Sequence, residues 1–107
     1  MKIVRHGIYW VSLDPTIGRE QQKTRPCVVV SPEAMHQTTM AVVCPLTSKL
    51  HPSWAHRLQL VCRRKIAEIM ADQIRAVSLA RFGGFIQQLS AAEVLQLQSI
   101  LTRLYGM

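Results

Sequence analysis

Short apolar runs separated by polar turns occupy most of the chain, and one stretch near its end has clear helical spacing. Runs of this length that are rich in β-branched residues are typical of buried strands. They predict strands at about residues 7–13, 26–31 and 40–46. Pro45 is expected to end or distort the third strand, because proline cannot donate a ladder hydrogen bond. The polar residues 33–39 could include a short turn of helix.

The second half of the chain continues the strand pattern. Residues 56–62 alternate between apolar and polar positions, which predicts a strand with one exposed face. Residues 66–77 have roughly helical spacing, but Gly83 and Gly84 follow too soon for a long helix to end cleanly. We therefore interpret residues 66–77 as a bent pair of strands, and residues 85–86 could add a last short strand.

One helix is predicted at the C-terminal end. Ser90 followed three residues later by Glu93 forms a capping box, and Gly106 ends the helix. Its apolar face consists of Val94, Leu97, Leu101 and Leu104. The length of 107 residues suits one core, so we expect a single α+β domain over residues 1–107, a small, strongly curved antiparallel sheet with this helix.

The charge balance favours a polyanionic partner. Thirteen Lys and Arg against six Asp and Glu give a formal net charge of +7, which suits nucleic acid or an anionic surface. No stretch approaches the ~18 apolar residues of a membrane span, and the N-terminal residues lack the apolar run of a signal peptide. We therefore expect a cytoplasmic protein with no membrane partner.

The cysteines and histidines do not form a recognisable ligand pattern. Cys27, Cys44 and Cys62 each lie in an apolar run, and no pair has C-x-x-C spacing, so we expect buried thiols rather than disulfides. The histidines are scattered along the chain at His6, His36, His51 and His56. We expect no metal site and no cofactor.

Arg25 follows a polar stretch over residues 14–24 and stands at the edge of an apolar run. Its planar guanidinium suits phosphate or carboxylate. It therefore forms either an anion site or a structural ion pair with a carboxylate such as Asp72, and the residues alone leave both possibilities open.

Two further polar segments allow two interpretations each. Thr47, Ser48 and Lys49 follow the third apolar run, where hydroxyl side chains usually make a turn by bonding their own backbone. Residues 63–65, Arg-Arg-Lys, form a basic turn. Its charges are either solvated at a hairpin or in contact with an RNA backbone.

Four blocks of sequence carry a family resemblance when they are taken together. They are Gly-x-x-Trp at 7–10, a block at 13–32 that contains Lys-Thr-Arg-Pro, Pro-Leu-Thr-Ser at 45–48, and Ala-Asp-Gln-Ile-Arg at 71–75. In this order and approximate spacing they resemble the MazF/PemK/Kid family of toxin endoribonucleases. The resemblance implies an SH3-like barrel with a C-terminal helix, and a homodimer. It also implies an antitoxin whose disordered acidic tail occupies the RNA groove, in a complex that binds operator DNA through the antitoxin.

The resemblance also implies roles for single residues. Arg25 and Thr47 match the family's catalytic arginine and threonine. RNA-binding roles fall on neighbours in the matching blocks, which are Glu20, Gln21, Lys23, Ser48, Asp72 and Gln73. Met70 occupies a position where part of the family has an arginine proposed as catalytic acid. That version of the mechanism is unavailable here unless Arg75 or Arg25 substitutes.

The residue types suit a reaction in which RNA supplies its own nucleophile, the 2′-hydroxyl. Arg25 would stabilise the charge that develops on the phosphate, and Thr47 would orient the phosphate or the 2′-hydroxyl. We expect single-stranded RNA as the substrate and 2′,3′-cyclic phosphate and 5′-hydroxyl ends as the products. Glu20, Asp72 and the histidines are the candidates for the general base, and none is assigned.

Two other functions stay open. The last residues, 104–107, are similar to the tail with which CcdB-type toxins of the same fold poison DNA gyrase. The simpler explanation is that Tyr105 packs the last helical turn and Gly106 caps it. The other alternative is a basic nucleic-acid-binding module that has lost catalysis, which Met70 favours.

Overall fold

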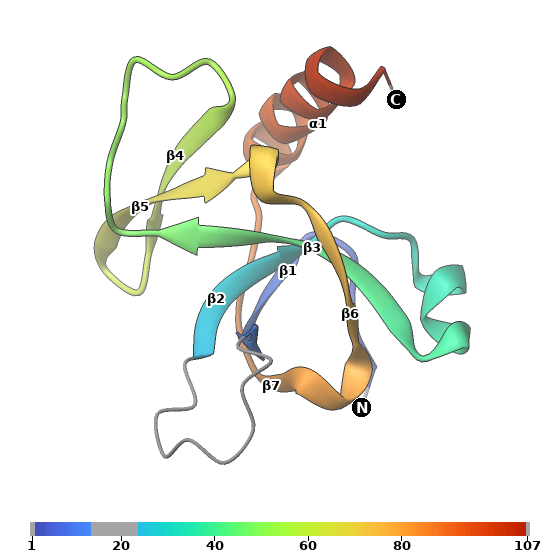
Figure 1. Cartoon of the computed structure of the whole chain (residues 1–107). Coiled ribbons are helices and arrows are strands. Elements are labelled where there is room, and N and C mark those ends of the chain that lie inside the picture. The colour runs from blue at the N-terminus through green and yellow to red at the C-terminus, as the bar shows by residue number, and fades with distance from the viewer. Residues whose placement is uncertain (1, 14–23, 107) are drawn as a thin grey trace.

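The computed structural model describes residues 2–13 and 24–106, which form one curled antiparallel sheet with an α-helix packed against it (Figure 1). The sheet has the order β4-β5-β3-β2-β1-β7, and β6 pairs with β3. The strands are β1 Gly7–Ser12, β2 Thr24–Val29, β3 Met40–Thr47, β4 Arg57–Cys62, β5 Lys65–Met70, β6 Arg75–Ser78 and β7 Phe82–Gln88. The helices are α1 Ala91–Tyr105 and three 3₁₀ segments, η1 Glu33–Thr38, η2 Ala71–Gln73 and η3 Leu79–Arg81. No helix among the described residues is long and apolar enough to cross a membrane.

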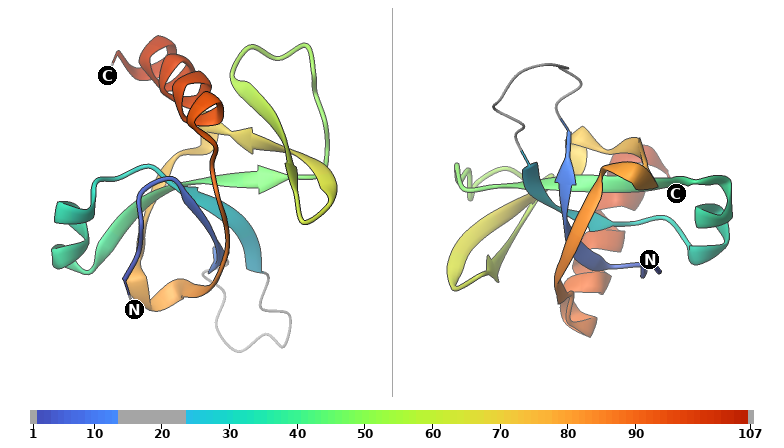
Figure 2. Two further views of the ribbon diagram at one scale, coloured as in Figure 1. Left: turned by 180° about the vertical axis from the view of Figure 1, so that it is seen from behind. Right: turned by 90° about the horizontal axis from the view of Figure 1, so that it is seen from below.

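Strand β3 organises the sheet because it belongs to several ladders. Its first half pairs with β6, its last two residues pair with β5, and its middle pairs with β2. β5 and β6 are therefore the bent strand pair predicted over residues 66–77, with η2 as the bend. The β4–β5 hairpin is displaced from the rest of the sheet in both views of Figure 2. At the other side of the sheet, β1 lies between β2 and β7, so the first and last strands are neighbours.

Pro45 does not end β3, although ending the strand was one of the two outcomes expected from the sequence. The strand continues through Pro45 to Thr47, and Pro45 pairs with Cys27 of β2. The proline lies between the ladder to β6, which ends at Val43, and the ladder to β5, which begins at Leu46. Its missing N–H therefore interrupts neither of these two ladders.

The predicted second strand is shifted toward the N-terminus. β2 begins at Thr24, because Thr24, Arg25 and Pro26 pair with Ser12, Val11 and Trp10 of β1. Arg25 is thus part of the strand and is not at a hinge before it. This placement fixes the backbone of Arg25 by the ladder to β1.

The C-terminal helix has the caps that the sequence predicts. The Ser90 hydroxyl accepts from the backbone N–H of Glu93, and the Glu93 side chain accepts from the backbone N–H of Ser90. Gly106 ends the helix in the left-handed conformation, φ 72°. The predicted apolar face needs one correction, because Ile100 is buried while Leu104 is 41% exposed. Leu104 borders an open space beside Ala55 and His56, and this loop covers it only in part.

The three cysteines are free and buried, as predicted. Burial raises the pKa of Cys27 and of Cys44 to about 12, and it also raises the pKa of Cys62. At a pH near 8 the folded protein should therefore resist iodoacetamide, because the thiolate is the reactive form. The unfolded chain should react at all three positions in guanidinium chloride, counted by intact-mass spectrometry.

The same pKa shifts predict a loss of stability in alkali. Above the ordinary thiol pKa of about 8.5, the unfolded chain loses protons that the folded chain keeps, so the free energy of unfolding should fall as the pH rises.

In the iodoacetamide experiment, rapid labelling of the folded protein without any unfolding signal would contradict the burial of the three thiols.

Candidate active site

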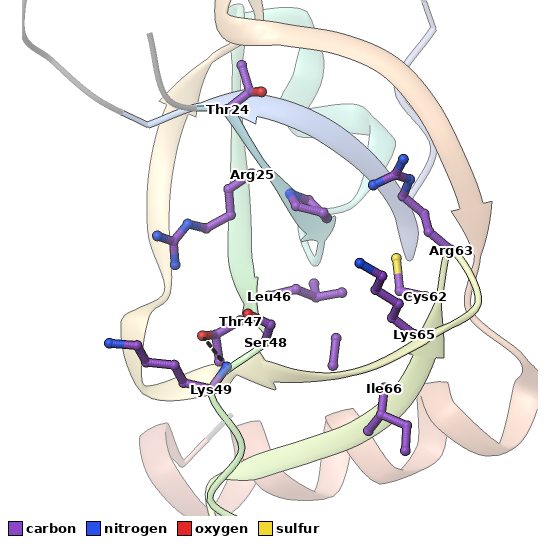
Figure 3. Close-up of a pocket in the computed structure, with 12 residues that line it drawn as sticks. Thr24, Arg25, Leu46, Thr47, Ser48, Lys49, Cys62, Arg63, Lys65 and Ile66 are labelled. Atoms are coloured by element: carbon purple, nitrogen blue, oxygen red, sulfur yellow. Dashed lines mark hydrogen bonds between the residues drawn. The ribbon is translucent and has the colours of Figure 1, made fainter. Parts of the chain in front are cut away.

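A cavity of about 550 Å³ opens between the start of β2, the end of β3 and the β4–β5 hairpin (Figure 3). Its lining residues are Thr24, Arg25, Pro26, Leu46, Thr47, Ser48, Lys49, Cys62, Arg63, Lys65, Ile66 and Ala67. Four of these side chains are cationic, and none of the described lining residues is Asp or Glu. The three segments are far apart in sequence, so the fold itself concentrates the positive charge. Such a cavity suits a phosphate group.

Arg25 lies on the exposed start of β2, and the half-buried Pro26 separates it from the buried residues 27–29. Its side chain extends along one side of the cavity in Figure 3. In the described part of the chain Arg25 makes no ion pair. The carboxylate of Asp72 is instead 3.6 Å from Nε of Arg57 and 3.8 Å from Nε2 of His56. The structural ion pair between Arg25 and Asp72 is therefore not formed, and the guanidinium is free to bind an anion in the cavity.

Thr47 and Ser48 lie at the end of β3 and border the same cavity. The Thr47 hydroxyl accepts a hydrogen bond of 3.1 Å from the backbone N–H of Lys49, so it does make the turn expected of a hydroxyl at a strand end. A hydroxyl has two lone pairs and one proton. The turn occupies one lone pair and leaves the proton free to be donated to a phosphate oxygen.

Glu68 anchors the loop that follows Thr47. This carboxylate is 1% exposed, and Glu68 is paired with Thr47 in the β3–β5 ladder. Both of its oxygens lie 2.9 Å from the backbone nitrogen of His51, and Oε1 also accepts from Nη1 of Arg57 at 3.2 Å. The loop over residues 48–56 is therefore tied to β5 directly behind the candidate threonine.

Ring stacking reinforces the same loop. The rings of His51 and Trp54 are parallel to within 5°, with centroids 3.7 Å apart. The guanidinium of Arg57 lies 4.7 Å from the Trp54 ring centroid. The part of the loop around Trp54 is therefore packed on itself before any ligand binds.

The pairing of Glu68 with Arg57 was not predicted from the sequence. The available signal was a single carboxylate within the apolar run Ile66-Ala67-Glu68-Ile69-Met70. A carboxylate in such a run is almost never fully buried without a partner, so it indicates a structural or functional ion pair. The partner could not be identified, because Arg57 lies eleven residues away on another strand.

The other predicted site residues divide into two groups. Asp72 and Gln73 lie in η2 and do not line the cavity, and their RNA-binding role stays a prediction. Glu20, Gln21 and Lys23 lie outside the described residues. Among residues 2–13 and 24–106, no three His, Cys, Asp or Glu side chains are grouped so that they could hold a metal ion. The structure thus brings together Arg25, Thr47 and Ser48, and it adds Lys49, Arg63 and Lys65.

Comparisons with known proteins identify the family and the fold of the chain. The family model described as "PemK-like, MazF-like toxin of type II toxin-antitoxin system" matches residues 4–105. Endoribonuclease PemK of Escherichia coli is 39% identical over 85 residues, which cover 75% of this chain and 64% of PemK. Endoribonuclease MazF9 of Mycobacterium tuberculosis is 33% identical over 115 residues, which cover 92% of this chain and 93% of that protein. A MazE-MazF crystal structure from Deinococcus radiodurans has a TM-score of 0.83 at 23% identity, covering 100% of this chain and 98% of that one, and it confirms the predicted fold.

Proposed function

Because the chain belongs to the PemK-like, MazF-like toxin family of type II toxin–antitoxin systems, we propose that it is an endoribonuclease that cleaves single-stranded RNA and thereby blocks translation. One observation carries the proposal. Arg25 and Thr47, which match the family's catalytic pair, come from different strands and line one cationic cavity. A cavity that only stabilised the fold would not need four cationic side chains around it, none of which forms an ion pair within residues 2–13 and 24–106.

The proposed reaction is an in-line attack of the RNA 2′-hydroxyl on the adjacent phosphorus. A bond forms between the 2′-oxygen and phosphorus, and the bond from phosphorus to the 5′-oxygen breaks. The 2′-hydroxyl proton is removed and the leaving 5′-oxygen is protonated, so no water is consumed. Arg25 stabilises the negative charge that grows on the non-bridging oxygens, and Thr47 donates to one of them.

The general base must accept the proton of the 2′-hydroxyl. Asp72, one candidate from the sequence, contacts Arg57 and His56 and does not line the cavity, which argues against this role. We retain Glu20 as the candidate, since it precedes Arg25 in the matching block, and it lies outside the described residues. Met70 is buried in the core and takes no part in proton transfer.

The proposed partners follow from the same charge. An antitoxin with an acidic segment would compete with RNA for the cavity, because both are polyanions. We also expect a homodimer, a cytoplasmic location where mRNA is present, and operator binding by the complex through the antitoxin. The solved relative from Deinococcus radiodurans is itself a MazE-MazF structure.

Gyrase poisoning is not favoured as a second function. The comparisons fall on the nuclease branch of the fold. The residues that suggested gyrase have structural roles here, because the Tyr105 hydroxyl donates to the carbonyl oxygen of Ala71 at 2.8 Å and Gly106 caps α1.

The test is incubation of the purified protein with a long unstructured RNA in EDTA. We expect cuts at a recurring short sequence, with 5′-hydroxyl ends that accept phosphate from polynucleotide kinase without prior phosphatase treatment. The matched control is the same RNA with a 2′-deoxynucleotide at the mapped site, which lacks the nucleophile and should stay intact. A 5′-phosphate product, or cleavage of the deoxy control, would contradict the mechanism. Intact RNA throughout would favour a binding module without catalysis.

A further inference from the structure

The turn between β4 and β5 is built from two arginines in an unfavourable conformation. Arg63 and Arg64 have φ values of 54° and 66°, both left-handed. Two-residue hairpin turns of this kind usually contain Asn and Gly, because a bulky side chain is strained at positive φ. The β4–β5 register closes the turn directly, with Cys62 paired to Lys65. Backbone strain at two successive arginines suggests that at least one of these side chains has a functional role at this turn.

The side chain of Arg63 packs on Trp10 of β1, which in turn contacts β7. Its guanidinium carbon lies 4.9 Å from the ring centroid of Trp10. Trp10 packs closely against β7, since a Cβ added at Gly83 would lie 3.3 Å from the Trp10 Cβ. The side-chain amide of Gln87 donates to the carbonyl oxygen of Val61 at 3.0 Å and so joins β7 to the hairpin. The position of Arg63 is therefore fixed in advance of any ligand.

The contact with Trp10 leaves the hydrogen-bond donors of Arg63 available. A cation–π contact acts through the charge of the guanidinium and does not require a hydrogen bond to an acceptor. Within the described residues, Arg63 makes no hydrogen bond or ion pair that would occupy its donors. The contact thus places a charged donor at the cavity without using its hydrogen-bonding capacity.

Arg63 borders the cavity that contains Arg25 and Thr47, but on the other side. In Figure 3, Arg25, Thr47 and Lys49 lie along one side, and Arg63 and Lys65 lie along the opposite side. A volume of about 550 Å³ is larger than one phosphate group needs and is of the size that holds a whole small molecule. Arg64, the other arginine of the turn, does not line the cavity.

We propose that Arg63 and Lys65 form a second phosphate subsite, which binds the backbone phosphate of a nucleotide flanking the cleavage site and so sets the register of the RNA. The proposal rests on the proposed endoribonuclease function. The subsite binds a phosphate that does not react, so it stabilises the ground state and the transition state equally. Loss of Arg63 should therefore raise KM about tenfold and leave kcat unchanged, and a dinucleotide that contains only the scissile phosphate should show no effect.

The decisive comparison is between Arg63→Asn and Arg64→Asn. Each change removes one positive charge from the same turn, and Asn tolerates the left-handed conformation. The probe is a single-stranded RNA with a 2′-deoxynucleotide at the mapped cut site, bound over a series of salt concentrations. One lost phosphate contact should make the slope of log K against log salt shallower by about 0.7. We expect this change for Arg63→Asn and for Lys65→Gln, no change for Arg64→Asn, and partial recovery for Arg63→Lys.

The outcomes separate this proposal from the proposed function. Equal slopes for the Asn variants at positions 63 and 64 would overturn the subsite, even if the protein cuts RNA normally. If the protein cuts no RNA, the probe is the unmodified single-stranded RNA, and a slope that still depends on Arg63 would support the subsite and refute the endoribonuclease. Lys65 lies on a regular strand, so its variant keeps the test valid if the turn at position 63 does not tolerate change.

Discussion

Replacing Arg25 by alanine should lower kcat for RNA cleavage by about 10²–10³-fold and change KM little. Arg25 lies on the exposed start of β2, where the pairing to Val11 fixes its backbone, and its side chain extends along the cavity (Figure 3). The guanidinium donates two hydrogen bonds to the non-bridging oxygens of the phosphate. These oxygens carry more negative charge in the transition state than in the substrate, so the transition state is bound more tightly. The loss should therefore appear in the chemical step, measured by single-turnover cleavage of an RNA of mapped sequence.

Arg75→Ala is the matched control for this change. Arg75 is an exposed arginine on β6, paired with Val43, and it does not line the cavity. We expect its removal to alter the rate less than twofold. The same variant tests whether Arg75 takes the role of the catalytic acid, since Met70 occupies the position where part of the family has an arginine. Similar losses for the variants at positions 25 and 75 would show that Arg75 has that role. Full activity without Arg25 would contradict the proposed mechanism.

Replacing Glu68 by alanine should lower the free energy of unfolding by about 3–5 kcal/mol. The side chains of Glu68 and Arg57 are only 1% and 7% exposed, so the change removes the buried charge partner of the guanidinium and leaves it only the more exposed carboxylate of Asp72, 3.6 Å from Nε. It also removes the acceptor for the backbone N–H of His51. Urea unfolding followed by far-ultraviolet circular dichroism measures the loss. Glu93→Ala is the control, because that carboxylate is at the exposed capping box of α1 and its removal should cost only about 1 kcal/mol.

A double change separates stability from the position of the loop. Replacing Glu68 by leucine together with Arg57 by methionine removes the buried pair without leaving a lone charge, and such replacements are often neutral. We expect this variant to recover most of the lost stability. It should still cleave RNA poorly, because His51 no longer ties the loop over residues 48–56 to β5. Normal cleavage by the double variant would show that the tether is not needed for the site.

Much of the fold could be predicted because its signals are local. The alternation in β4 and the capping box at Ser90 and Glu93 depend on residues only a few positions apart, and both are confirmed. The local sequence did not show that β3 continues through Pro45, because a proline is tolerated where two ladders on a strand leave a gap, and that gap is a property of the whole sheet. The burial of Ile100 in place of Leu104 likewise depends on how far a distant loop covers the helix.

The candidate site shows the same division. Arg25 and Thr47 could be identified from the family resemblance, since their motifs are contiguous, and the structure places both at one cavity. The role of the basic turn at residues 63–65 could not be assigned from local sequence. It depends on the contact of Arg63 with Trp10 and on the position of Arg63 and Lys65 at the cavity. The partner of Glu68 was equally out of reach. Interactions that link separate strands are thus the part that the sequence pattern does not contain.

The pairing of the first strand with the last one also governs when the protein can acquire its structure. Gly7 and Gln88 are partners in the β1–β7 ladder, although almost the entire chain separates them. Contacts of such high sequence separation slow folding, because the chain must close a long loop before the contact stabilises it. During synthesis the edge of β1 that β7 later covers stays open until Phe82–Gln88 have emerged from the ribosome. We therefore expect nascent chains to be inactive and open to capture by other proteins until β7 has been made.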